Sequence, residues 1–495
     1  MSVGRLTYKF GPLERRGILG PVRAGQALSL ALGALLAIAC LDASPNATGA
    51  VLALLLFGVF VALAVVPMRE RTLEEWAPVA CSFVLRRVGG RRRWTSEAPA
   101  RGARLRLGGR SGHVIDPAVT PPPSLRGVDI VEIAYRKRPI GALAEQSGRL
   151  LTAVLACRVV AFSLLEAEAQ ERRLARWGLV LSSSASTAIR RIQWLERTAP
   201  AEGDELARWL HDERDPSVPL RGAPMIESYL ELIGTTARVT QEHEILVAVQ
   251  VDARRVPSGE EAQEALVEQT ERVAQGLEAA EVSVLGALST RQLSRMLRTA
   301  FDPYARAELA ALEAADPCRE GLGRANAWPL GTYESWDHYR SDGAVHATYW
   351  IGGWPRVEVS PMFMDALLGR SSAVRTVAVT FAPVPPERST REVEAAITRD
   401  RADRELRHRF GQLETARQRQ AQESTLRREA ELAAGHGEVR VAGFVTVSGR
   451  DPDELRRASS EVLEHAARAR LELYRMYGQQ ADAFTFTLPL CRGLK

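Results

Sequence analysis

The sequence predicts an α+β protein in which a transmembrane two-helix hairpin precedes mixed α/β domains that contain one long helix. Three observations support this prediction. Two almost uncharged apolar runs lie within the first 68 residues. After residue 94, short runs of apolar and β-branched residues alternate with amphipathic stretches, which is the pattern of strands and helices that share a core. Between residues 389 and 435 a charged helical pattern continues without a break.

The two apolar runs extend from Ala24 to Leu41 and from Ala43 to Met68, and only Asp42 separates them. An apolar helix of about 20 residues crosses the hydrocarbon layer, so each run is long enough to span it. The sequence DASPN favours a tight reversal between them. We therefore expect a membrane hairpin with spans at Ala24–Leu41 and Gly49–Val66. A cleaved secretion signal and a buried core hairpin are the alternatives; a second apolar run directly after the first argues against a signal.

Basic residues precede the first span and follow the second, whereas the loop that connects the two spans carries only Asp42. Because arginine-rich flanks stay on the cytoplasmic side, we expect both termini and the soluble domains to face the cytoplasm. Residues 71–94 show apolar positions at helical spacing beside three consecutive arginines, which favours a helix along the inner membrane surface. A linker helix packed on the soluble domain is the alternative. The residues expected to flank the membrane are Arg15, Arg16, Arg23, Arg69, Arg71 and Trp76.

Composition divides the chain into three predicted domains. Residues 1–93, the membrane module, carry 12 basic and 5 acidic side chains, whereas the rest carries 53 basic and 55 acidic ones. A stretch rich in glycine and proline near residue 322 predicts a boundary between two soluble α+β domains, 94–322 and 323–495. The second domain contains the long helix, 391–434, and the sequence STRE before it fits a capping box of Ser389 and Glu392.

The balanced charges of the long helix favour a projecting helix or helical hairpin with ion pairs on its surface, and a docking arm for a partner subunit is the alternative. Apolar patterning places the other elements. Strands are predicted at 103–109, 128–136, 150–162, 189–198, 243–253, 282–289, 343–354, 374–384, 438–449 and 481–490. Helices are predicted at 166–185, 204–211, 225–235, 259–279, 289–303, 362–368 and 452–477.

No group of residues points to catalysis or to a bound cofactor. A phosphate-binding P-loop needs a lysine directly after a glycine, and none of Lys9, Lys137 and Lys495 has one before it. The five cysteines are far apart and lack metal-ligand spacing, which argues against a disulfide framework or a zinc site. Asp337 and His338 fit an exposed polar loop. We therefore expect no enzyme, with no catalytic, cofactor-binding or metal-binding residues.

Seven tryptophan and tyrosine side chains gather between Trp328 and Trp354. Stacking on single-stranded nucleic acid is conceivable for such a group. The soluble part is slightly acidic and has no basic stripe, so core and interface packing is the favoured interpretation and direct nucleic-acid binding is doubtful.

Several motifs together resemble a known family. They include YKFGPLERRGILG before the hairpin, RTLEEWAPV after it, RTAFDP, SWDHYR, and ELYRMYGQQADAFTFTLPL near the C-terminus. The combination resembles an actinobacterial, conjugation-associated family that pairs a PrgI-like hairpin with a cytoplasmic region similar to the N-terminal part of VirB/TraC-type secretion ATPases. In those ATPases the P-loop motor follows, whereas this sequence stops where the motor would begin.

The resemblance implies a non-enzymatic inner-membrane scaffold of a type IV secretion-like, conjugative DNA transfer apparatus. Its expected partners are the membrane, a separate P-loop secretion ATPase and other secretion subunits, and an oligomer is expected. The long helix and the aromatic region are the candidate interfaces. The first alternative is a type VII secretion component of the EccE kind, which also has a soluble domain after two N-terminal spans.

Two further alternatives belong to other classes. A membrane-tethered nucleic-acid-binding protein would bind through arginines such as Arg101, Arg104, Arg106 and Arg110 and would lose affinity steeply with salt. An unrecognised membrane enzyme would require a pocket with converging titratable groups.

Overall fold

The computed structural model divides the chain into two compact units, which are described separately. One unit comprises residues 12–91 and 396–422, and the other comprises residues 1–11, 92–395 and 423–495. The structure describes residues 24–68, 71–96, 121–135, 138–158, 162–200, 224, 225, 228, 241–306, 309, 327–355, 357–369, 371–409 and 416–494.

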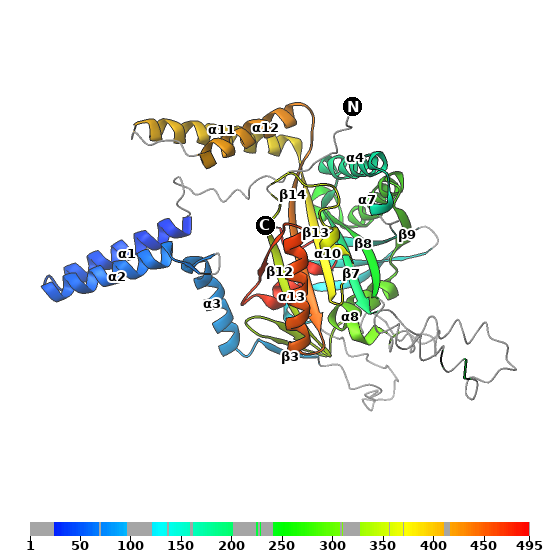
Figure 1. Cartoon of the computed structure of the whole chain (residues 1–495), viewed down its shortest axis with the longest axis horizontal. Coiled ribbons are helices and arrows are strands. Elements are labelled where there is room, and N and C mark those ends of the chain that lie inside the picture. Colours follow the sequence, from blue (N-terminus) through cyan, green and yellow to red (C-terminus); the bar gives the residue numbers. More distant parts are fainter. Residues whose placement is uncertain are drawn as a thin grey trace. The chain divides into compact units, whose positions relative to one another are not determined.

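The first unit begins with two apolar helices, α1 (Ala24–Ala43) and α2 (Ala47–Val65), which lie side by side (Figure 1). The Gln26 amide donates to the Ala64 carbonyl at 2.9 Å, and Gly33 lies against Phe60, so the helices run antiparallel. Both are long and apolar enough to cross a membrane. The hairpin predicted from the two apolar runs is therefore present.

A short ladder of β1 (Pro67–Met68) and β2 (Arg71–Thr72) leads from α2 into α3 (Leu73–Val88). The Glu75 carboxylate accepts from the Thr72 N–H at 3.3 Å, which satisfies a free donor at the start of α3. Helix α11 (Pro386–Arg409) and helix α12 (Ala416–Ala433) also contribute residues to this unit, and Arg404 donates to Gln422 at 2.7 Å between them.

The second unit is built on one sheet of 13 strands, in which every pairing is antiparallel. The main order is β3-β10-β11-β12-β14-β13-β7-β8-β6-β5-β4, with β15 also beside β12 and β9 also beside β6. The strands are β3 (Arg93–Thr95), β4 (Val128–Ile133), β5 (Ile140–Glu145), β6 (Leu150–Arg158), β7 (Ile189–Pro200), β8 (Gln241–Asp252), β9 (Ser283–Ala287), β10 (Gly331–Glu334), β11 (Tyr339–Ser341), β12 (Ala344–Gly353), β13 (Val374–Val384), β14 (Glu438–Gly449) and β15 (Glu472–Arg475).

The order of elements repeats within this sheet. The helices are α4 (Ala167–Ser183), α7 (Gly259–Ala279), α8 (Thr290–Phe301), α10 (Asp365–Leu368), α13 (Pro452–Arg468) and α14 (Gln480–Phe484). The first copy runs β6-α4-β7-β8-α7-β9 along the chain, and the second runs β12-α10-β13-β14-α13-β15. In the sheet the strands of the first copy lie in the order β9-β6-β8-β7, and those of the second lie in the equivalent order β15-β12-β14-β13. This is the ferredoxin-like βαββαβ arrangement. A hairpin precedes each copy and a helix follows it, α8 in the first and α14 in the second.

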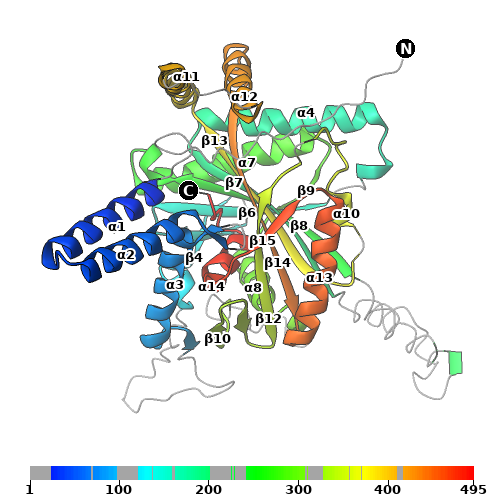
Figure 2. The same cartoon turned by 60° about the vertical axis from the view of Figure 1, so that its left-hand side comes forward.

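The two copies join where β7 pairs with β13, with Leu195 opposite Ala378. The helices of both copies cover one face of the sheet, because Trp194 on β7 packs against the clusters under α4 and α7 and under α10 and α13 (Figure 2). The opposite face is covered by α8, α14 and the residues that follow α14, which bury Leu195, Ala248 and Ala378. Both faces of the central strands are buried, which explains continuous apolar runs such as β6.

Local signals set many of the boundaries. The Ser258 hydroxyl accepts from the Glu261 N–H at 3.2 Å at the start of α7. Asp451 caps α13 by accepting from the N–H groups of Asp453 and Glu454, and Pro452 occupies the first helical position. These helices begin where the sequence predicts them.

The predicted α+β class is confirmed, and several predicted elements are wrong. The stretch 481–490 is not a strand but most of α14, a short 3-10 turn and a bent tail, because it packs over the sheet instead of joining it. The helix predicted to reach residue 477 ends at Arg468 and is followed by β15. Strand β5 was not predicted, since IGALAE lacks β-branched residues beyond its first position.

The region predicted as one long helix, 391–434, contains α11 and α12 instead. The predicted capping box is also wrong: α11 begins at Pro386, and Ser389 is buried inside its first turns. Glu392 is held by Arg388 and Arg440, each at 2.8 Å, which confirms that ion pairs stabilise this region.

Some predictions fall outside the described residues. The strand at 103–109, the helix at 204–211 and the boundary near residue 322 lie there, as does nearly all of the helix at 225–235. The division into 1–93, 94–322 and 323–495 therefore stays a prediction.

A buried histidine ties α8 to the second copy of the fold. His346 on β12 is fully buried, with Nε2 at 3.0 Å from the Phe301 carbonyl and Nδ1 at 2.8 Å from the Ser448 hydroxyl. Nε2 also lies 2.8 Å from the Ser341 hydroxyl, which itself donates to the Phe301 carbonyl. Burial lowers the pKa of His346 from 6.5 to about 4, so the ring is neutral near pH 7. Since a carbonyl oxygen only accepts, Nε2 carries the ring proton and Nδ1 accepts from Ser448.

We expect the folded protein to lose stability as the pH falls from about 6.5 to 4. Over that range the unfolded chain binds a proton at His346 and the folded chain does not, and the full effect is on the order of 3 kcal/mol. Unfolding of the full chain in detergent measures it, and His346→Gln should abolish this contribution. His436→Gln, at an exposed site, is the control. An unchanged pH dependence in His346→Gln would contradict the assignment.

Candidate functional site

The residues predicted to flank the membrane are only partly described. Arg15, Arg16, Arg23 and Arg69 lie outside the described residues, and only the backbone of Arg71, in β2, is described. Trp76 is half-buried on α3. The structure therefore does not bring this set together.

Helix α3 nevertheless carries a surface suited to lipid. Val84, Leu85 and Val88 are 53%, 66% and 81% exposed. Arg86 and Arg87 lie between these apolar residues in the last turns of the helix. Exposed apolar side chains beside arginines are typical of helices at an anionic membrane surface. The interfacial position of α3 stays a prediction.

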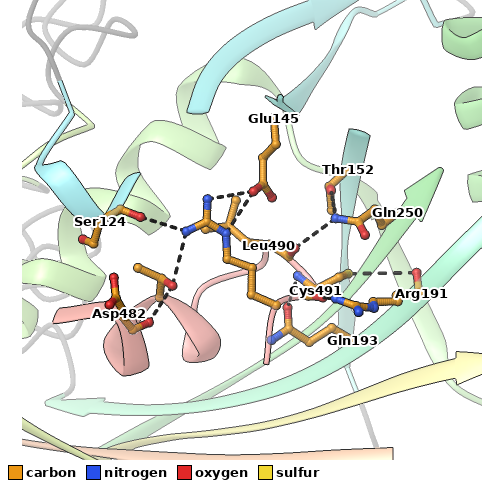
Figure 3. Close-up of polar contacts among 11 residues, drawn as sticks. Ser124, Glu145, Thr152, Arg191, Gln193, Gln250, Asp482, Leu490 and Cys491 are labelled. Carbon is orange, nitrogen blue, oxygen red and sulfur yellow. Dashed lines mark hydrogen bonds and ion pairs between the residues drawn. The ribbon is translucent and has the colours of Figure 1, made fainter. Parts of the chain in front are cut away.

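A group of polar side chains surrounds the C-terminal crossing segment, defined as residues 485–494. This segment runs over the sheet face opposite α4 and α13 and contacts strands of both copies. Figure 3 shows its polar contacts with the first copy. At its start the Thr487 hydroxyl is 2.7 Å from the Thr446 hydroxyl on β14. Near its end the Thr380 hydroxyl on β13 donates to the Arg492 carbonyl at 3.3 Å. The segment therefore spans the junction between the copies.

Two buried amide side chains pair with the backbone of the crossing segment. Gln193 on β7 donates to the Phe486 carbonyl at 2.8 Å and accepts from the Cys491 N–H at 2.9 Å. Gln250 on β8 donates to the Leu490 carbonyl at 3.0 Å (Figure 3). A buried backbone group without a partner is costly, so these amides allow the segment to lie on the sheet without strand pairing.

Arg492 fixes the far end of the segment on the first copy. Its Nη2 and Nε atoms donate to Glu145 Oε2 on β5 at 2.7 and 2.9 Å, and its Nη1 donates to the Ser124 carbonyl at 2.9 Å. The neighbouring Gly493 has a φ of +94°, and a Cβ there would lie 2.3 Å from the ring of Phe444. Only glycine fits this approach.

Burial disfavours the reactive thiolate form of the buried cysteines Cys157 and Cys491. Cys491 in the crossing segment has its pKa raised by burial, and burial also raises the pKa of Cys157 on β6 to about 11. A thiol that stays protonated is a poor nucleophile. Within the described ranges, no three histidine, cysteine or acidic side chains are grouped to hold a metal ion.

Described residues of this unit line two cavities that differ in chemistry. The first, about 440 Å³, opens beside the crossing segment, and arginines contribute much of its lining: Arg126, Arg190, Arg191 and Arg492. The second, about 750 Å³, is mainly apolar and lies between α4, the end of α7 and residues 432–437. Leu179 in the second cavity is 66% exposed. Residue spacing gave no sign of either cavity, because their linings come from distant segments.

The aromatic residues between Trp328 and Trp354 pack mainly into the core, as predicted. Trp328, Tyr339 and Tyr349 are buried. Tyr339 and Phe484 have ring centroids 5.3 Å apart, so this group also holds α14. Asp337 and His338, expected in a polar loop, lie 2.8 Å apart between β10 and β11.

Comparison with protein families gives one match. Residues 240–351 match a family model described as "Putative type VII ESX secretion system translocon, EccE". The match extends from β8 through α8 and the β10–β11 hairpin into β12. It therefore includes the chain segment that connects the first copy to the second. No curated protein matches the chain.

The match contradicts the resemblance to the conjugation-associated, PrgI-like type IV family. That resemblance depended on short segments, several of which lie outside residues 240–351, such as those around the hairpin and after α13. The family model, in contrast, matches one continuous stretch of 112 residues, 240–351. The finding supports the alternative of a type VII, EccE-like membrane component.

We expect Gln193→Ala to destabilise the second unit by roughly 2–6 kcal/mol. The change leaves the Cys491 N–H and the Phe486 carbonyl unpaired in the core, and each unpaired group costs about 1–3 kcal/mol. Denaturant unfolding of the full chain measures the loss, and proteolysis of the C-terminal residues should accelerate. The matched control is Gln275→Ala at an exposed position on α7, expected within about 0.5 kcal/mol of the unaltered protein. Equal stabilities would refute this role.

Proposed function

We propose that this chain is an EccE-like membrane component of a type VII secretion system. The family match over residues 240–351 carries the proposal. The two apolar helices α1 and α2 support it, because they provide a membrane anchor of sufficient length. In this proposal the α+β unit lies in the cytoplasm and acts as a scaffold that performs no catalysis.

The proposed partners are other subunits of the same secretion system, including a separate P-loop ATPase, within an oligomeric membrane complex. The apolar cavity beside α4 is our candidate contact surface, since Leu179 is exposed there and a neighbouring subunit would bury it. The ion-paired helices α11 and α12 are a second candidate. Arg101, Arg104, Arg106 and Arg110, named for the nucleic-acid alternative, lie outside the described residues.

The orientation can be tested with single cysteines in a background where Cys40, Cys81 and Cys318 are serine. Pro45→Cys, in the exposed loop between α1 and α2, should react with an impermeant maleimide in intact cells. Glu168→Cys, on an exposed side chain of α4, should react only after permeabilisation. The reason is that arginines precede the first span and follow the second, and arginine-rich flanks stay on the cytoplasmic side. The reverse labelling pattern would refute cytoplasmic placement.

The partners can be tested by purification from native membranes in mild detergent, followed by mass spectrometry. We expect recovery of other type VII subunits and of a P-loop ATPase. Leu179→Asp should reduce their yield at least severalfold, because it places a charge in the apolar cavity. Leu164→Asp is the matched control, since Leu164 is 81% exposed and lies outside that cavity. Recovery of the chain alone, or with nucleic acid that dissociates at moderate salt, would refute the proposal.

A further inference from the structure

The arginine-lined cavity of about 440 Å³ has an excess of positive charge. Arg492 is paired with Glu145, and Arg191 donates to two carbonyls of the crossing segment, those of Cys491 and Leu494. The side chains of Arg126 and Arg190 make no hydrogen bond or ion pair with any residue that the structure describes. Arg126 and Arg190 therefore leave the lining with positive charge that no carboxylate of the described residues neutralises through an ion pair.

The arginines also affect one another. The pKa of Arg191 is lowered by burial and by the charge of Arg190. Asp252 lies near enough for the charge of Arg190 to act on it, but its carboxylate is already paired with Arg149 at 3.4 Å. Like charges held together in a partly buried site favour the entry of an anion.

Two buried acceptors in the same lining restrict the kind of anion. Glu145 is 5% exposed and Gln250 is 1% exposed, and both line the cavity. Glu145 Oε1 and Gln250 Oε1 have no hydrogen-bond partner among the described residues. An anion that only accepts hydrogen bonds would leave both oxygens unsatisfied, and it would be repelled by Glu145. An anion that also carries a hydroxyl would satisfy them.

We propose that this cavity binds a phosphate group that retains a hydroxyl donor, either free hydrogen phosphate or the phosphate of a small phosphorylated alcohol. Arg126 and Arg190 would bind the phosphate oxygens, because guanidinium groups match phosphate geometry. The hydroxyl would donate to Glu145 Oε1 or Gln250 Oε1. Since Leu490 and Arg492 also line the cavity, the ligand would rest against the crossing segment.

Calorimetric titration of the full chain in detergent with inorganic phosphate at neutral pH tests the proposal. We expect one site, and we expect sulfate to bind about tenfold more weakly, because sulfate carries no proton to donate. Glycerol 3-phosphate serves to distinguish the two sources: tighter binding than inorganic phosphate identifies a phosphorylated alcohol, and weaker binding identifies the free ion.

The double variant Arg126→Gln/Arg190→Gln should lose at least tenfold in phosphate affinity. The two single variants provide the same comparison if the double variant does not fold. Arg158→Gln is the matched control, because Arg158 is an exposed arginine at the other end of β6 and lies outside the cavity. Absence of phosphate binding, or equal affinity in the double variant, would overturn the proposal. Equal affinity for sulfate would overturn the role of the two buried acceptors.

Discussion

The pairing of buried glutamine side chains with the C-terminal crossing segment is the interaction on which the rest of the sheet unit depends. Gln193 and Gln250 lie on β7 and β8, near the junction of the two copies, and satisfy backbone groups that strand pairing leaves open. The apolar side chains of the segment can then cover one face of the sheet, because the carbonyls of Phe486 and Leu490 and the N–H of Cys491 have partners there. The segment binds both copies, so it resists their separation at the β7–β13 pair.

The repeat explains how a sheet of 13 strands stays covered on both faces. Each ferredoxin-like copy supplies helices for one face only. The other face is closed by α8, α14 and the crossing segment, and His346 holds the end of α8 to β12 and β14 through Phe301 and Ser448. The arginine-lined cavity lies where this second layer ends, beside Arg492. A ligand bound there would contact both the crossing segment and the sheet.

The family match supports the type VII, EccE-like alternative. It covers residues 240–351, from β8 into β12, and the helices α1 and α2 are long and apolar enough to cross a membrane. The type IV interpretation is contradicted by this match. It depended on several short motifs, of which RTAFDP and SWDHYR lie within residues 240–351 and the others lie outside that stretch.

The sequence by itself determined the elements that have a strong local signal. The apolar runs predicted α1 and α2, the capped amphipathic stretch after Ser258 predicted α7, and the apolar run at 150–158 predicted β6. Only the tertiary structure determined the conformation of ADAFTFTLPL, because the alternation of apolar residues in this stretch also fits a strand. The segment forms a helix and a tail whose side chains Phe484, Leu488 and Leu490 are buried against the face of the sheet. The sequence likewise did not predict the arginine-lined cavity, since Arg126, Arg190 and Arg492 are far apart along the chain and come together only in the fold.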